Sequence, residues 1–113
     1  MNFEIKKVSK ILSEMVTYAL MGDAKIIDVS IENNGDMFRI LINARNINRT
    51  LESINGLREQ LNSPRQRAAE EYYWELAGDS DTGTELSLVG MMTDKAIVEY
   101  KDNNLYIELH RYK

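Results

Sequence analysis

Residues 25–42 read KIIDVSIENNGDMFRILI, two apolar runs on either side of a turn sequence. Apolar and polar residues alternate in both runs, which is the period of a strand with one buried face. The segment between them, Asn33-Asn34-Gly35-Asp36, has the residue types that favour a hairpin turn. The stretch therefore predicts two antiparallel strands. Their matching apolar faces are formed by Ile27, Val29 and Ile31 and by Phe38, Ile40 and Ile42.

Helical periodicity lies on both sides of this hairpin, and a second hairpin ends the chain. Gly22 follows the first helical pattern, at a position where a left-handed residue is favoured. Ser63-Pro64 resembles a cap and a first-turn proline, and therefore predicts the start of a helix. The predicted helices span about residues 7–21, 47–62, 63–77 and 84–92, and the last strands span about 95–100 and 105–111.

This order of elements predicts an α+β fold. We expect a two-layer α/β sandwich, in which helices cover one face of a mixed, mostly antiparallel sheet. A chain of 113 residues with 43% hydrophobic content supports one compact core rather than two. Residues 1–113 are therefore expected to form a single domain.

Composition excludes several classes of function. A formal net charge of -4 offers no basic surface for DNA or RNA, which draw their affinity from clustered Lys and Arg. The absence of cysteine excludes disulfides, thiolate catalysis and Cys-ligated metals. No apolar run reaches the ~20 residues that span a bilayer, and residues 1–10 do not resemble a signal peptide. We therefore expect a cytoplasmic protein with no membrane or nucleic-acid partner.

Three segments, in order along the chain, resemble the motifs of one family. Residues 13–20, SEMVTYAL, are similar to a helical N box with a Glu, and the hairpin of residues 25–42 follows. Residues 81–89, DTGTELSLV, resemble a late glycine box. The chain thus resembles the GHKL ATPase domains of sensor histidine kinases and anti-sigma-factor serine kinases. The resemblance implies a histidine kinase-like ATPase fold and an ancestry in bacterial signalling.

The residues that hold nucleotide in that family are replaced here. Tyr18 stands where the family has the Asn that ligates magnesium, and a phenol is a poor Mg²⁺ ligand. Ala44 stands where the family has the Asp that recognises adenine. In the glycine box only Gly83 is kept, between Asp81 and Glu85. These carboxylates repel phosphate, and Thr82 with Glu85 fits a helix capping box that uses the free amides itself.

The resemblance and its departures together predict a non-catalytic regulatory or protein-interaction domain that uses no cofactor and no metal. The alternative is a divergent ATP-binding protein of the anti-sigma-factor serine kinase type, using ATP with Mg²⁺. In that alternative Glu14 occupies the position of a catalytic Glu, whereas the simpler reading makes it a solvated helix residue. A third hypothesis is a structural subunit whose open sheet edge pairs with another chain.

Two further groups are candidate contact residues. Tyr72, Tyr73 and Trp74 are consecutive on a predicted helix, so their rings point in different directions and cannot all enter one core. Exposed aromatic side chains are favoured interface anchors, although Trp74 lying flat on its own surface is an equal alternative. His110 shares a strand face with Tyr106, Glu108 and Tyr112, and is expected to be a surface or interface residue, since a lone His offers no metal site. Candidate partners are an unidentified protein or a second copy of the chain, bound through a sheet edge or these aromatics.

Overall fold

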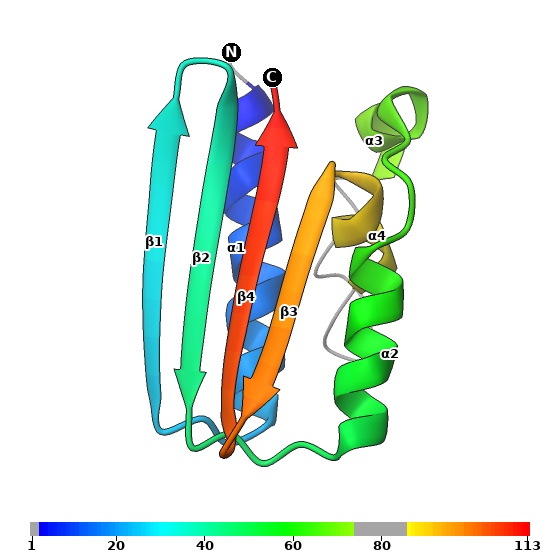
Figure 1. Ribbon diagram of the computed structural model, residues 1–113. Coiled ribbons are helices and arrows are strands. Elements are labelled where there is room, and N and C mark those ends of the chain that lie inside the picture. The colour runs from blue at the N-terminus through cyan, green and yellow to red at the C-terminus, as the bar shows by residue number, and fades with distance from the viewer. Residues whose placement is uncertain (1–2, 74–85) are drawn as a thin grey trace.

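The computed structural model describes residues 3–73 and 86–113, which form one α+β unit (Figure 1). All three strand pairings are antiparallel, in the order β1-β2-β4-β3. The fold class predicted from the sequence is confirmed. The elements are α1 (Phe3–Met21), β1 (Ile26–Asn34), β2 (Met37–Arg45), α2 (Leu51–Leu61), α3 (Arg67–Tyr73), α4 (Leu86–Met91), β3 (Lys95–Lys101) and β4 (Asn104–Tyr112).

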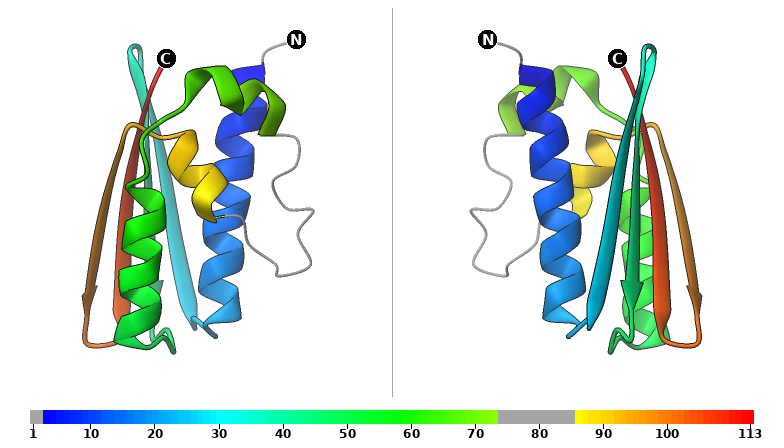
Figure 2. Two further views of the ribbon diagram at one scale, coloured as in Figure 1. Left: turned by 90° about the vertical axis from the view of Figure 1, so that its right-hand side faces the viewer. Right: turned by 90° about the vertical axis from the view of Figure 1, so that its left-hand side faces the viewer.

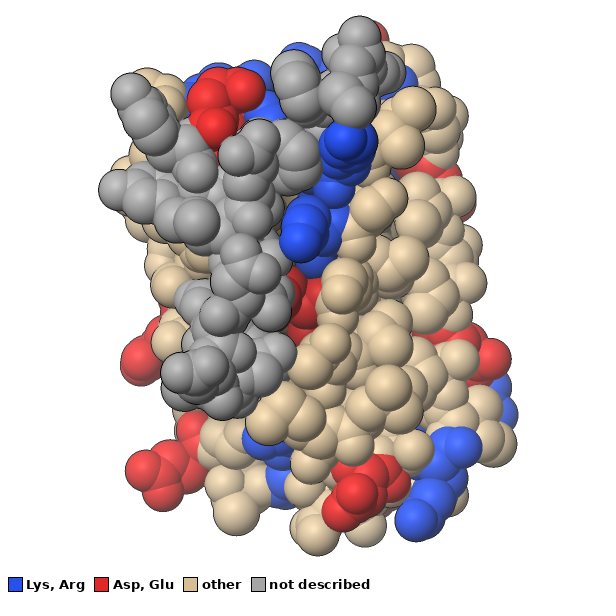
Figure 3. All heavy atoms as spheres, turned by 180° about the vertical axis from the view of Figure 1, so that it is seen from behind, with Lys and Arg blue, Asp and Glu red and all other residues tan. Residues whose placement is uncertain are grey.

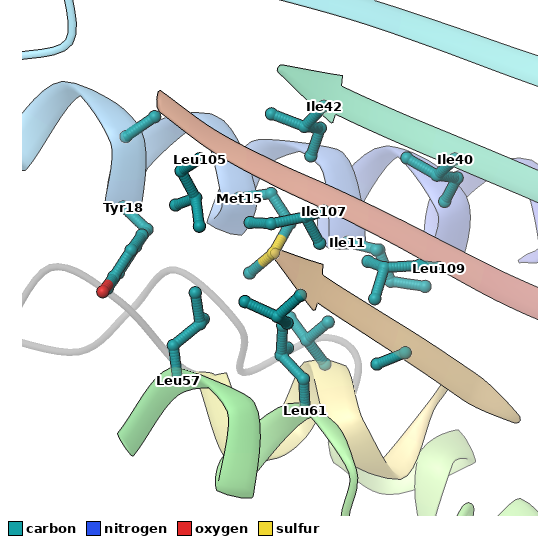
Figure 4. Close-up of a cluster of buried hydrophobic side chains, with 14 of the residues drawn as sticks. Ile11, Met15, Tyr18, Ile40, Ile42, Leu57, Leu61, Leu105, Ile107 and Leu109 are labelled. Atoms are coloured by element: carbon teal, nitrogen blue, oxygen red, sulfur yellow. The ribbon is translucent and has the colours of Figure 1, made fainter. Parts of the chain in front are cut away.

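Within residues 3–73 and 86–113 the helices all lie on one side of the sheet, and none of them covers the other face, which we call the bare face (Figure 2). α1 packs on β2, whereas α2 packs on β3 and on α4. The core lies between the two layers and is drawn in Figure 4. The side chains labelled there come from α1, α2, β2 and β4: Ile11, Met15, Tyr18, Ile40, Ile42, Leu57, Leu61, Leu105, Ile107 and Leu109. Val89 of α4 and Ala96 and Val98 of β3 also belong to the core.

The first hairpin has the register that its alternating pattern predicts. Val29 lies opposite Ile42, and Ile31 lies opposite Ile40. Ile40 and Ile42 are buried, but Val29 and Ile31 remain 42% and 44% exposed on the same face. The difference arises because α1 lies over β2, and β1 extends past the edge of the helical layer (Figure 1).

Three helix starts differ from those predicted. α1 begins at Phe3, four residues before the predicted start. α2 begins at Leu51 rather than at residue 47, because the Thr50 hydroxyl accepts the Ser53 backbone N–H over 3.0 Å and caps the helix there. Ile47 is buried although it precedes α2 in the chain. Its spacing with the apolar residues of α2 therefore wrongly indicated that it is part of the helix. α3 begins beyond Ser63-Pro64, where the Gln66 carbonyl accepts the first helical N–H bonds.

Gly22 closes α1 for a different reason from the one predicted. The residue in the left-handed region is Asp23, with φ of 58°. Gly22 is needed because a Cβ there would lie 2.8 Å from Ile47 Cγ1 and 2.9 Å from Arg49 Nε. The segment that enters α2 therefore passes directly against the end of α1.

Candidate functional site between α1 and α2

Tyr18 joins the last turns of α1 to the start of α2. Its hydroxyl lies 2.9 Å from Ser53 Oγ, and its ring is only 4% exposed. The Arg49 guanidinium lies 3.9 Å from the centre of that ring, in cation–π geometry. Arg49 Nη2 also donates to the Tyr18 carbonyl oxygen over 2.8 Å. Both the ring and the hydroxyl of Tyr18 are therefore committed to contacts within the protein.

Ala44 is part of the core. It lies on β2 opposite Ile27 on one side and Leu105 on the other, and none of it is exposed. A carboxylate at this position would be surrounded by apolar side chains, and ionised groups are costly to bury without a partner. Tyr18 and Ala44 belong to the same apolar cluster. The third altered segment, with Asp81, Gly83 and Glu85, lies outside the described residues.

A hollow of about 370 Å³ opens beside Tyr18, between α1, α2 and the first residue of α4. Its polar lining includes Arg49, Ser53, Glu59 and Gln60. Within the described residues, Arg49 Nε is buried there without a hydrogen-bond partner. The hollow is therefore large enough for a small molecule, but its lining combines one cation with one carboxylate.

Glu14 is not the solvated helix residue that was expected, because only 2% of it is exposed. It lies on α1 seven residues after Lys7, two helical turns along the same flank. Lys7 is itself buried, with Nζ 3.3 Å from Glu70 Oε1 on α3. α3 therefore covers the part of this flank that bears Lys7, and the flank is buried although the sequence pattern assigned Glu14 to solvent.

Glu70 anchors α3, the helix that contains Tyr72 and Tyr73. Its carboxylate receives hydrogen bonds from Lys7, Arg65 and Arg111, at 3.3, 3.3 and 2.9 Å. Burial alone would raise the pKa of Glu70, but the hydrogen bonds from the two arginines outweigh it and lower the pKa to about 2. α3 is thus held by charges, while Trp74 lies outside the described residues.

Arg111 is a buried partner of Glu70 that was not predicted from the sequence. Its side chain has no exposure, and its Nε donates to Glu4 over 2.9 Å while Nη1 donates to the Met92 carbonyl over 2.6 Å. Burial would lower the pKa of Arg111, but the hydrogen bonds to Glu4 and Glu70 raise it.. The available signal was strand parity, because Arg111 follows the core residues 105, 107 and 109 at alternate positions.

A second charged cluster lies on the bare face of the sheet. Glu108 accepts hydrogen bonds from Arg39 Nε at 2.9 Å and from the Tyr106 hydroxyl at 2.6 Å, and its Oε2 lies 2.6 Å from His110 Nε2. The hydrogen bond from Arg39 is the main reason that the pKa of Glu108 falls to about 2. The predicted sharing of one face by Tyr106, Glu108 and His110 is confirmed.

The part of the chain that the structure describes contains no group of three or more His, Asp or Glu side chains able to hold a metal ion. It also contains no helix with both the length and the apolar character that a bilayer crossing requires. No protein-family model matches the chain, and no curated protein sequence matches it.

Proposed function

We propose that this chain is a non-catalytic regulatory domain that acts by binding another protein and that neither binds nor hydrolyses ATP. The observation that carries the proposal is the position of Tyr18. The side chain that replaces the expected magnesium ligand contacts Ser53 and lies against Arg49, so Tyr18 serves as a packing residue beside the hollow. A core position for Ala44 supports the same conclusion, since no carboxylate is available there for adenine.

The proposed setting is a cytoplasmic signalling pathway of bacterial type, in which the domain has a histidine kinase-like ATPase fold and regulates a protein partner. This setting rests on the resemblance of residues 13–20, 25–42 and 81–89 to GHKL domains. We propose Tyr72, Tyr73 and Trp74 as contact residues for that partner. α3 ends at Tyr73 and is fixed by the buried ion pairs of Glu70, which supports a contact role for this helix.

The hollow beside Tyr18 favours one alternative function, a divergent ATP-binding protein of the anti-sigma-factor serine kinase type. In this alternative ATP and Mg²⁺ would enter the space lined by Arg49 and Gln60, and the buried Glu14 would be the catalytic carboxylate. Arg49 would supply a cation for phosphate, whereas Glu59 would repel it.

Calorimetric titration with ATP and Mg²⁺, and then with ADP, separates the two functions. The proposal predicts no heat of binding from protein whose circular dichroism shows it to be folded. Micromolar binding would overturn the proposal in favour of the alternative. The rate of ATP turnover by a Glu14→Gln variant that still binds ATP would then show whether catalysis depends on that carboxylate.

A further inference from the structure

The two edge strands of the sheet, β3 and β1, differ in whether a helix borders them. β3 is bordered by α2, and Arg58 Nη2 on that helix donates to the Val98 carbonyl on β3 over 3.1 Å. β1 is the other edge strand and has nine residues. Its pairing with β2 runs without a bulge, and it contains no proline. Long, regular edges without such interruptions are templates for another strand, because every second residue directs its N–H and C=O away from the sheet.

The helix-facing side of β1 is apolar and half exposed. Val29 and Ile31 lie there. Lys7 of α1 lies against α3, so the opposite flank of α1 is turned toward the β1 side of the sheet (Figure 1). That flank bears Ile5, which is 62% exposed, and the half-buried Leu12. Seen from behind the sheet, the surface on the β1 side of α1 is mostly uncharged (Figure 3). A strand edge and an apolar surface are thus combined in one place, which we call the β1 surface: Ile5, Leu12, Val16, Ile27, Val29 and Ile31.

We propose that the β1 surface binds the β1 surface of a second copy of the chain, with the two β1 strands antiparallel and Val29 at the two-fold axis. In this register Val29 lies opposite Val29 of the second copy, and Ile27 lies opposite Ile31 of the second copy. The helix-facing positions of one strand therefore meet only the helix-facing positions of the other. A self-complementary apolar row of this kind is what a two-fold interface requires.

Charge selects this register over its neighbour. On the bare face, pairing about Val29 places Asp28 opposite Ser30 of the second copy, whereas pairing about Ser30 would place Asp28 opposite Glu32 of the second copy. Like charges in directly opposed positions are destabilising. Both carboxylates also have a partner within their own copy, since Asp28 binds Arg45 at 2.7 Å and Glu32 binds Arg39 at 2.8 Å. The edge can therefore meet its own copy without uncompensated acidic charge.

The resulting assembly has a defined shape. Two four-stranded sheets become one continuous eight-stranded sheet, with both α1 helices on the same face and one β1 strand between each helix and the axis. The contact uses nine strand residues and one helix flank from each copy, fewer than the ~20–30 residues per side of a standard stable interface. We expect a dissociation constant in the micromolar range.

The absence of natural cysteine allows a direct test of the register. In a Val29→Cys variant, the two sulfurs would sit on directly opposed residues, whose Cα atoms lie about 5.5 Å apart, within the range that a disulfide spans. In the control Asn33→Cys, the two cysteines would be roughly 26 Å apart at about 3.3 Å per residue. Mild oxidation should convert most of the first variant, and little of the second, to a crosslinked dimer. Preferential crosslinking of a Ser30→Cys variant, or equal crosslinking of Val29→Cys and Asn33→Cys, would overturn the proposal.

Sedimentation equilibrium of the unmodified protein, over about 1 μM to 1 mM, tests the assembly itself. We expect dimerisation that weakens at least tenfold in Val29→Glu and changes less than twofold in the control Leu51→Glu. Leu51 is 70% exposed on α2, so both variants place a Glu on an exposed apolar position. A folded protein that stays monomeric at the highest concentration, or a dimer that both variants affect equally, would contradict the proposal. This result is independent of whether ATP binds.

Discussion

Arg111 on β4 donates its Nη2 to Glu70 Oε1 on α3 over 2.9 Å, and neither side chain is more than 4% exposed. This pair joins β4, the last strand, to α3. Two residues separated by 41 positions are thus bound in a place from which water is excluded. Charges in such a place depend on each other, because removing one leaves the other buried without compensation.

Glu70→Gln is expected to destabilise the protein by about 3 kcal/mol, since it removes the negative charge that Arg111, Arg65 and Lys7 share. Urea unfolding followed by circular dichroism measures the change. Glu71→Gln is the matched control: Glu71 also contacts Lys7, but its side chain is 62% exposed, and we expect a loss below about 0.5 kcal/mol. Equal losses in the two variants would show that burial of Glu70 does not matter.

Stability should fall steeply in acid. Glu70 has a usual pKa of 4.5 and a pKa of about 2 in the folded protein, so the unfolded chain takes up its proton first. The stabilisation is complete above pH 4.5 and is lost as the pH falls towards 2, on the order of 3 kcal/mol from this group. The pKa of Glu4, lowered mainly by its hydrogen bond with Arg111, adds to the same trend. Urea midpoints between pH 6 and pH 2 should therefore fall more steeply for the unaltered protein than for Glu70→Gln; parallel curves would contradict the assignment.

Tyr18→Phe should cost about 1 kcal/mol, because the ring stays beneath Arg49 while the contact of the hydroxyl with Ser53 Oγ is lost. Tyr112→Phe removes the same atom from an exposed tyrosine and should change the unfolding free energy little. A double-mutant cycle with Ser53→Ala isolates the pair: if the effects of Tyr18→Phe and Ser53→Ala simply add, the hydroxyls do not interact.

Introducing the residues that GHKL domains have at the altered positions, one at a time, should not produce nucleotide binding. Tyr18→Asn supplies a carboxamide but removes a buried ring, so it should lower the free energy of unfolding by about 3 kcal/mol. Calorimetric titration of this variant with ATP and Mg²⁺ should show no heat of binding. Ala44→Asp and Glu85→Gly, tested separately, should be equally silent, because each concerns a different part of the ligand. Strong ATP binding by any one of these variants would count against the proposed loss of the site.

Two glycines should respond in opposite directions to alanine. Gly22→Ala forces a methyl group within 2.8 Å of Ile47 and 2.9 Å of Arg49, and should destabilise by roughly 1–3 kcal/mol. Gly56→Ala meets no atom within 4 Å and improves the propensity of α2, so it should stabilise by about 0.5–1 kcal/mol. Thermal unfolding of the two variants in parallel provides the comparison, and a stabilised Gly22→Ala variant would refute the close approach.

The hairpins were predictable because strand alternation is a local property: residues 25–42 and 95–111 specify their faces without reference to the rest of the chain. Helix starts were less predictable, since Ile47 has the spacing of a helical stripe but packs against Gly22 before Thr50 begins the helix. The burial of Glu14 and Arg111 depends on which distant segment covers them, and residue type argued against it. The alternation of apolar and polar residues placed Val29 on the helix-facing side of β1. It gave no information on whether a helix extends far enough to cover the Val29 side chain.

The contact between Arg58 and the Val98 carbonyl has a consequence for the size of an assembly. A sheet with two available edges can add copies without end and become a fibre, whereas a sheet with one occupied edge has only one direction of growth. Arg58 already donates to the Val98 carbonyl, so a strand that joined the β3 edge of a β1-linked pair would compete with that contact. The contact of Arg58 with β3 would thus disfavour growth beyond the pair.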